Sequence, residues 1–246
     1  MTWQDIYASE LQAVWALQVV PLLYLAWRAL LAAPVEWRPA TVEGRLAWFV
    51  DRYAIVFALE TILDPLATTP LLNALGIAGQ PAGTAVMIAF VLLGDFRVYL
   101  LVFALLALAA GQTWRVALPR AAAWTLLVPA IAVPLDAALR VAAPGRDPNS
   151  IWLVYESVFT LVALGLRTRL AGAPPLVRDA LRAVLAYVAL YYALWASSDV
   201  LIQLLGLDAG WLLRIVPNQL YYAFWIPFVV WRCGKRNPQM NTENHR

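Results

Sequence analysis

Seven long apolar stretches occupy most of this 246-residue chain and leave little sequence for a polar surface. Apolar residues make up 63% of the chain and charged residues 13%, against roughly 25% charged in a soluble domain. In a bilayer only helices and closed barrels satisfy every backbone group, and these stretches do not alternate as barrel strands would. The sequence therefore predicts an all-α, polytopic protein of the cell membrane, a seven-transmembrane-helix bundle surrounded by the lipid bilayer.

Gly, Pro and Asp punctuate the stretches, and a membrane crossing needs about 20 mostly apolar residues. On this basis the expected spans are 11–33, 50–73, 84–110, 117–142, 151–169, 181–206 and 211–232. We expect one bundle domain over residues 1–236, followed by a polar cytoplasmic tail over residues 237–246.

Basic residues gather at one end of the expected spans. Fourteen of the eighteen Lys and Arg residues lie in the first, third and fifth connections, in the span ends next to them, or at and after the end of the last span. The positive-inside rule then places the N-terminus outside and the C-terminus in the cytoplasm. The N-terminal segment lacks a basic region before its apolar run and a small-residue cleavage site, which is typical of a mature start and not of a signal peptide. The net charge of +3 lies mainly in loops and tail, so we expect no nucleic-acid partner.

Six acidic side chains lie at least one helical turn inside the expected spans, where an ionised carboxylate is costly and usually functional. They are Glu60, Asp64, Asp95, Asp136, Glu156 and Asp199. Placed by depth, all of them fall between the midplane of the bilayer and the expected outer face. This asymmetry predicts a polar pocket that opens outward, or sideways from the outer leaflet.

Some of these acids have structural explanations. Asp136 and Arg140 are four residues apart and are expected to pair along one helix face. Glu156 lies one turn inside its span, from which it can extend to the outer interface. Arg97 is the one basic residue well inside the hydrocarbon, and it can form either a structural ion pair or part of a functional site.

The candidate catalytic residues are the remaining acids, Glu60, Asp199, Asp95 and Asp64. A buried carboxylic acid in its neutral form is a proton donor, which general acid chemistry and proton coupling both need. Deep aromatic rings can stabilise a carbocation through their π faces, although each of them alone is also an ordinary packing residue. With the polar groups nearby, they give the candidate substrate-binding residues Arg97, Trp195, Tyr191, Asn218, Tyr222 and Trp225.

Several kinds of chemistry are excluded by what the spans lack. The single His, Lys and Cys of the chain all lie near its C-terminus, so no metal site, haem site or retinal Schiff base is expected inside the membrane. Glu60 and Asp64 are spaced to bind Mg²⁺ and a diphosphate, but only Arg97 and Arg214 lie near enough to hold phosphates. We therefore expect neither a metal nor a cofactor.

A Glu on an early helix, an Asp on a late one and the small seven-span size resemble the membrane-bound terpene cyclases of meroterpenoid and indole-diterpene pathways. Glu60 and Asp199 are the corresponding positions, although Asp199 falls on the sixth span, earlier than the family pattern. The resemblance implies an integral membrane enzyme that protonates and cyclises an isoprenoid, with a hydrophobic small molecule as its substrate.

Two other functions remain open on the residues alone. Carboxylates near the midplane and a second span broken by Pro65 also suit a proton-coupled transporter or channel. The acids can instead form structural networks with Arg97 and Arg140 in a binding or scaffold protein. The sequence leaves the oligomeric state open.

Overall fold

The computed structural model describes residues 2–38, 40–145, 147 and 149–234, and the regular structure within them is entirely helical. Six helical stretches are long and apolar enough to cross a membrane. They are Leu11–Leu30, Val42–Ala74, Pro81–Ala109, Trp114–Ala142, Ser150–Gly172 and Pro175–Leu204. The predicted all-helical membrane fold is confirmed at this level. The predicted tail over residues 237–246 lies outside the described residues.

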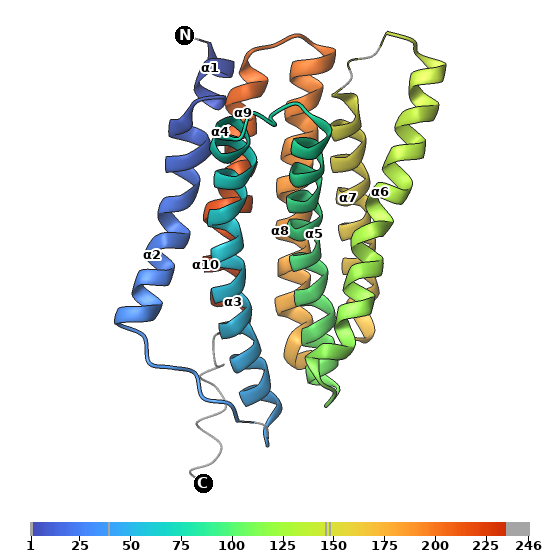
Figure 1. The fold of residues 1–246 in the computed structure, drawn as a ribbon. Helices are drawn as coiled ribbons and strands as arrows, with labels where there is room; N and C mark the ends of the chain where they lie inside the picture. The colour runs from blue at the N-terminus through green and yellow to red at the C-terminus, as the bar shows by residue number, and fades with distance from the viewer. Residues whose placement is uncertain (1, 39, 146, 148, 235–246) are drawn as a thin grey trace.

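The long helices pack side by side, and consecutive ones run in alternating directions (Figure 1). Their order is α1 (Trp3–Tyr7), η1 (Leu11–Ala16), α2 (Leu17–Leu30), α3 (Val42–Leu66), η2 (Ala67–Leu71), α4 (Leu72–Ala74), α5 (Pro81–Ala109), η3 (Trp114–Val116), α6 (Ala117–Ala142), α7 (Ser150–Arg169), η4 (Leu170–Gly172), α8 (Pro175–Asp199), η5 (Val200–Leu204), α9 (Ala209–Asn218), η6 (Gln219–Ala223) and α10 (Trp225–Cys233). Helices η1, η2, η5 and η6 have the wide π-helical turn.

Two spans begin earlier than the hydropathy pattern predicts. Helix α3 begins at Val42 and not near residue 50, because the Thr41 hydroxyl accepts a hydrogen bond from the Gly44 amide and caps the helix. Helix α8 begins at Pro175 and not near residue 181, with the proline in the first turn, where its missing amide hydrogen is not needed. Polar first turns extend these helices beyond their apolar cores.

The seventh apolar stretch differs from a single helix over 211–232. It forms α9, the π-helical turn η6 and α10, with a bend at Phe224 between the last two. Pro217 lies near the end of α9 and provides no amide hydrogen for the helical ladder. The π turn η6 follows, and the bend at Phe224 then interrupts the helix, so this stretch is not among the six continuous spans.

Helix α5 lies at the centre of the bundle and is buried almost continuously from Gly94 to Leu108. It contacts α3, α6 and α8. At one point it approaches η6 very closely: a side-chain Cβ at Gly94 would lie 1.5 Å from the Tyr221 hydroxyl oxygen. Glycine at this position therefore lets the Tyr221 ring lie against α5.

Helix α2 is joined to α3 by polar contacts at two levels. Arg28 donates to both carboxylate oxygens of Asp51, at 2.6 and 3.0 Å, in a largely buried pair. Further along, the Gln18 side-chain amide donates to the Ile62 carbonyl at 3.1 Å. Because a bidentate guanidinium–carboxylate pair fixes orientation as well as distance, these contacts set how α2 lies on α3.

Replacing Gly94 with alanine tests the close approach of α5 and η6. The added methyl group overlaps the Tyr221 hydroxyl, so Gly94→Ala should destabilise the protein by about 1–3 kcal/mol, as overpacking does. Gly165→Ala is the matched control: it lies in α7 with open space around it, and should be neutral or stabilising by about 0.5–1 kcal/mol. Thermal unfolding in detergent measures both, and equal stability of the two variants would contradict the packing described.

Candidate functional site

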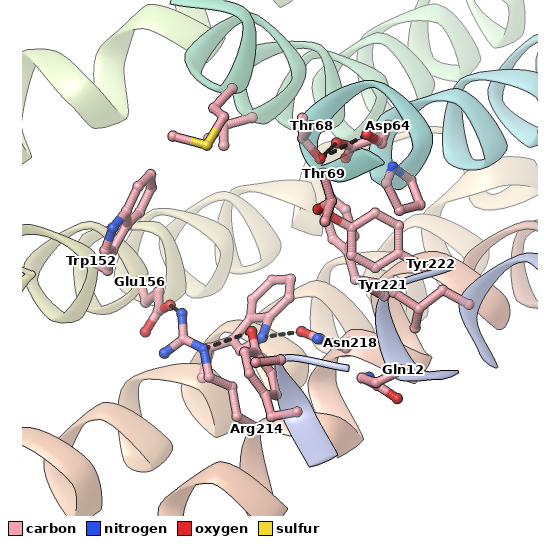
Figure 2. A pocket seen from close by; sticks show the side chains of 18 of the residues that line it. Gln12, Asp64, Thr68, Thr69, Trp152, Glu156, Arg214, Asn218, Tyr221 and Tyr222 are labelled. Carbon is pink, nitrogen blue, oxygen red and sulfur yellow. Dashed lines mark hydrogen bonds and ion pairs between the residues drawn. The ribbon is translucent and has the colours of Figure 1, made fainter. Parts of the chain in front are cut away.

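A cavity of about 440 Å³ lies at the α1 end of the bundle (Figure 2). Its walls come from α1, η1, α2, α3, η2, α5, α7, α8, α9 and η6. Aromatic side chains dominate the lining: Tyr7, Trp152, Tyr155, Tyr192, Trp195, Tyr221 and Tyr222. Small-molecule sites typically enclose about 300–1,000 Å³, so the volume suits a ligand of small-molecule size.

Three of the four π-helical turns of the described chain contribute residues to this cavity, and the fourth, η5, follows Asp199, which pairs with the lining residue Arg214. Gln12 lies in η1, and the turn η2 follows Asp64 and Pro65. The turn η5 follows Asp199, and η6 follows Asn218. Because a π turn rotates the side chains that follow it relative to an α-helix, it brings polar groups onto the inner face of a span. Such turns are frequent at functional sites.

Asp64 is the one candidate catalytic acid of the sequence analysis that lines the cavity directly. It lies near the end of α3 and is 5% exposed. The Thr68 hydroxyl lies 3.5 Å from its Oδ1, and the side chain of Tyr222 also hydrogen-bonds to it. None of the described cations forms an ion pair with Asp64. An unpaired charge is costly in such surroundings, which favours the neutral form of this carboxyl group.

Glu60 lies one turn before Asp64 and belongs to a different set of contacts. Its Oε2 accepts a hydrogen bond from Arg97 at 3.0 Å, and Thr61 accepts from the same Arg97 nitrogen at 3.0 Å. The Arg97 guanidinium also donates to the Tyr221 carbonyl at 2.8 Å and lies 4.0 Å from the centre of that ring. Neither Glu60 nor Arg97 lines the cavity. The pair instead lies beneath Tyr221, which does.

Asp95 is completely buried on α5, behind the residues that line the cavity. Each of its carboxylate oxygens accepts a short hydrogen bond from a phenol, one from Tyr155 on α7 and one from Tyr192 on α8. The two tyrosines line the cavity, whereas Asp95 does not. The two phenols therefore connect the carboxyl group to the cavity through their hydrogen bonds.

Asp199 and Glu156 share the guanidinium of Arg214. Arg214 pairs closely with Asp199 and lies 3.4 Å from Oε1 of Glu156, and its Nε donates to the Tyr7 hydroxyl at 3.2 Å. The expectation that Glu156 extends to the outer interface is wrong: this side chain is 4% exposed and lines the cavity. The short connection between α8 and α9 brings Arg214 back to the level of Asp199, where it compensates both acids.

The candidate substrate-binding residues divide into two groups. Trp195, Asn218 and Tyr222 line the cavity, and the Trp195 indole donates to the Asn218 side-chain oxygen at 2.8 Å. Tyr191 and Trp225 are fully buried behind the lining. The Trp225 indole nitrogen donates to the hydroxyl of Tyr53, which lies deeper in the bundle, so Trp225 supports the site from below.

Asp136 lies apart from the cavity, as its spacing predicts. Its Oδ2 accepts from Arg140 at 2.6 Å, and its Oδ1 accepts from the Ser150 hydroxyl at 3.0 Å. The predicted Asp136–Arg140 pair, which lies within α6, is confirmed. The hydrogen bond from Ser150 to the same carboxylate connects the end of α6 to the start of α7. Among the described residues, no group of three or more His, Cys, Asp or Glu side chains is arranged to hold a metal ion.

Helix α1 covers one side of the cavity, and the sequence provided no signal for this. Its first amides are capped from α9: the Trp3 amide donates to Asp208 Oδ2 at 2.8 Å. The Tyr7 and Trp211 rings pack 5.1 Å apart. At its start, hydrogen bonds from the Thr2 amide and hydroxyl lower the pKa of Asp5, which therefore stays ionised near the helix N-terminus.

Several lining residues were not among the candidate site residues of the sequence analysis, among them Tyr7, Gln12, Glu156, Tyr155 and Arg214. For Arg214 the sequence contains a signal, because Arg214 lies near the start of the seventh stretch and Asp199 lies in the outer part of the sixth, at a similar depth. No protein family, no curated protein and no solved structure matches this chain. What the site does must therefore follow from its own geometry and chemistry.

The Arg97–Glu60 pair is tested by a double-mutant cycle. Arg97→Met leaves Glu60 buried without its cation and should destabilise the protein by about 3–5 kcal/mol. Adding Glu60→Gln to that variant removes the unpaired charge and should recover much of the loss. Thermal unfolding in detergent measures the cycle, and additive effects of the two substitutions would show that the pair is not coupled.

Proposed function

We propose that the protein is an integral membrane enzyme that uses carboxyl acid–base chemistry on a lipid or isoprenoid, protonating and cyclising a hydrophobic substrate. The observation that carries this proposal is the position of Asp64. It is a buried carboxyl with no ion-pair partner among the described residues, and it faces a cavity lined by seven aromatic side chains. A neutral acid opposite π faces is what the protonation of an alkene or epoxide requires.

In the proposed reaction Asp64 supplies the first proton. Its O–H bond breaks and the π electrons of a substrate alkene form the new C–H bond, which leaves a carbocation on the neighbouring carbon. Ring faces such as those of Trp152, Trp195 and Tyr222 then stabilise the positive charge as the chain cyclises. The aromatic walls also limit access of water, which would otherwise capture the cation.

The acids to which the terpene-cyclase resemblance points, Glu60 and Asp199, take supporting roles in this proposal. Glu60 neutralises Arg97, whose guanidinium holds Tyr221 against the cavity. Asp199 neutralises Arg214 at the opposite part of the lining. Paired with cations, both carboxylates are poor proton donors, so Asp64 is the better candidate for the acid.

The structure favours an enzyme over a proton-coupled transporter. The cavity lies at one end of the bundle, and beyond Arg97 the interior becomes apolar. On α5 the buried residues from Val98 to Leu108 include a single polar side chain, Tyr99, and the buried residues of α8 from Val177 to Ala189 are all apolar. A transported proton or solute would find no polar path along these buried faces of α5 and α8.

We also propose that the chain crosses the membrane seven times, with the cavity on the outer side. The stretch from α9 to α10 supplies the seventh crossing, and Figure 1 shows it running from the α1 end of the bundle toward the other end. The basic connections after α2, α5 and α7 lie at the end away from α1, which the positive-inside rule assigns to the cytoplasm.

Replacing the proposed acid tests the function. Asp64→Asn should lower turnover by at least about 100-fold while leaving thermal unfolding nearly unchanged, because the amide keeps the shape but cannot donate the proton. The assay incubates the purified protein in D₂O with farnesol, geranylgeraniol and their terminal epoxides. Products of alkene protonation should carry deuterium, as mass spectrometry detects.

Asp179→Asn is the matched control, because Asp179 is an exposed acid at the far end of α8. The Asp179→Asn variant should convert the substrate at the same rate as the parent protein. Full activity of Asp64→Asn would refute the assigned role, and uptake into liposomes that depends on a pH gradient would favour transport instead.

The membrane orientation is tested with two matched alanines in exposed turns at opposite ends of the bundle. In a Cys233→Ser background, Ala143→Cys should react with a membrane-impermeant maleimide on intact cells. Ala171→Cys should react only after permeabilisation. The reverse pattern would contradict the orientation, and labelling of both on intact cells would contradict the span count between them.

A further inference from the structure

The contacts of Asp95 distinguish it from the other acids. Both of its carboxylate oxygens are occupied by phenol donors, Tyr155 and Tyr192, and it has no ion pair within the described residues. Two other phenols nearby, those of Tyr99 and Tyr191, have no hydrogen-bond partner although they are buried. The pairing with Asp95 is therefore specific to the two tyrosines that line the cavity.

This arrangement satisfies the carboxyl group in both of its protonation states. As a carboxylate, Asp95 accepts one hydrogen bond from each phenol, and two such donors stabilise the charge. As a neutral acid, it donates to one phenol oxygen and accepts from the other, and the first phenol turns its own O–H toward the cavity. A site whose hydrogen bonds are complete before and after proton uptake can exchange a proton at little cost.

The surroundings of Asp95 contain one cation, which is already engaged. The titratable or charged groups that face it are Tyr155 of α7, Tyr191 and Tyr192 of α8, and Arg97 and Tyr99 of its own helix. Arg97 pairs with Glu60, so it contributes a favourable field at Asp95 without a direct bond. The carboxyl group is thus free to change its charge without breaking an ion pair.

We propose that Asp95, Tyr155 and Tyr192 form a proton-accepting site for the cavity, in which the phenols pass a proton from a cavity ligand to the carboxylate behind them. The identity of the ligand rests on the proposed function, in which it is the substrate carbocation. A C–H bond next to the cationic carbon breaks, and its electron pair forms the product alkene. The released proton binds a phenol oxygen while that phenol's own proton moves to Asp95.

The cycle balances without any other reactant. Asp64 loses one proton at the start and Asp95 gains one at the end, and water that enters the cavity after the product leaves returns the proton from Asp95 to Asp64. The phenols also have a protective effect. A carboxylate in direct contact with a carbocation would form an ester with it, whereas Asp95 lies behind the two hydroxyl groups and outside the lining.

The test uses Asp95→Asn and the double variant Tyr155→Phe with Tyr192→Phe, with Tyr99→Phe as the matched control. Tyr99 lies on the same helix as Asp95, and its hydroxyl is buried without a partner. Infrared difference spectra between acidic and alkaline buffer should show a carboxyl band that is lost in Asp95→Asn. The band should shift in the double variant and stay unchanged in Tyr99→Phe.

Product analysis gives the second measurement. With a substrate that the parent protein cyclises, the double variant should still consume substrate through Asp64 but form at least about tenfold less alkene, with alcohols from water capture in its place. Unchanged alkene yield together with an infrared band that survives in Asp95→Asn would overturn the proposal. If Asp95→Asn fails to fold, the shift of the band in the double variant decides.

The two proposals fail in different ways. If none of the isoprenoids is converted but the carboxyl band behaves as described, the accepting site stands and the proposed reaction falls. If Asp64→Asn abolishes turnover while the double variant and Tyr99→Phe give the same products and the same spectra as the parent protein, the reaction stands and the accepting site falls.

Discussion

The buried guanidinium of Arg97 is the contact on which the lower boundary of the cavity depends. It connects three segments that are distant in sequence: α5, which carries it, α3 through Glu60, and η6 through the Tyr221 carbonyl and ring. The Arg97 carbonyl in turn accepts from Tyr53, whose hydroxyl accepts from the Trp225 indole. A buried ion pair adds little net stability compared with apolar packing, but it specifies which helix faces meet. Here it fixes Tyr221 between the apolar core and the cavity.

The two arginines divide the buried acids into two kinds. Arg97 compensates Glu60, and Arg214 compensates Asp199 and Glu156. Asp64 and Asp95 have hydroxyl partners and no arginine partner among the described residues. Acids paired with arginines keep a fixed charge and hold structure, whereas acids paired with hydroxyls can gain or lose a proton while their contacts persist. The proposed chemistry assigns the proton steps to the second kind.

The sequence predicted the all-helical class of fold and the Asp136–Arg140 pair. These follow from composition and from spacing within one helix, where contacts repeat every three to four residues. It did not predict which acid meets Arg97 or that Arg214 returns to Asp199 and Glu156. Such contacts depend on how each helix is rotated about its axis, and the rotation is set by packing between helices and not by the local sequence.

Two further features could not be read from the sequence for related reasons. The π turns near Asp64, Asp199 and Asn218 shift the inner face of a span by part of a turn, so regular helical spacing misplaces the residues beyond them. Helix α1 is short and polar, and only its capping by Asp208 and the packing of Tyr7 on Trp211 bring it over the cavity. The largest shifts of span boundaries, by contrast, occur at the starts of α3 and α8, where polar first turns extend a helix.

The central claim is that Asp64 holds a proton beside the cavity while Glu60, one turn away, is ionised against Arg97. The most direct measurement is the infrared spectrum of protonated carboxyl groups in the purified protein at neutral pH. The account predicts a protonated carboxyl band that disappears in Asp64→Asn and remains in Glu60→Gln. A band that survives in Asp64→Asn and disappears in Glu60→Gln would contradict it.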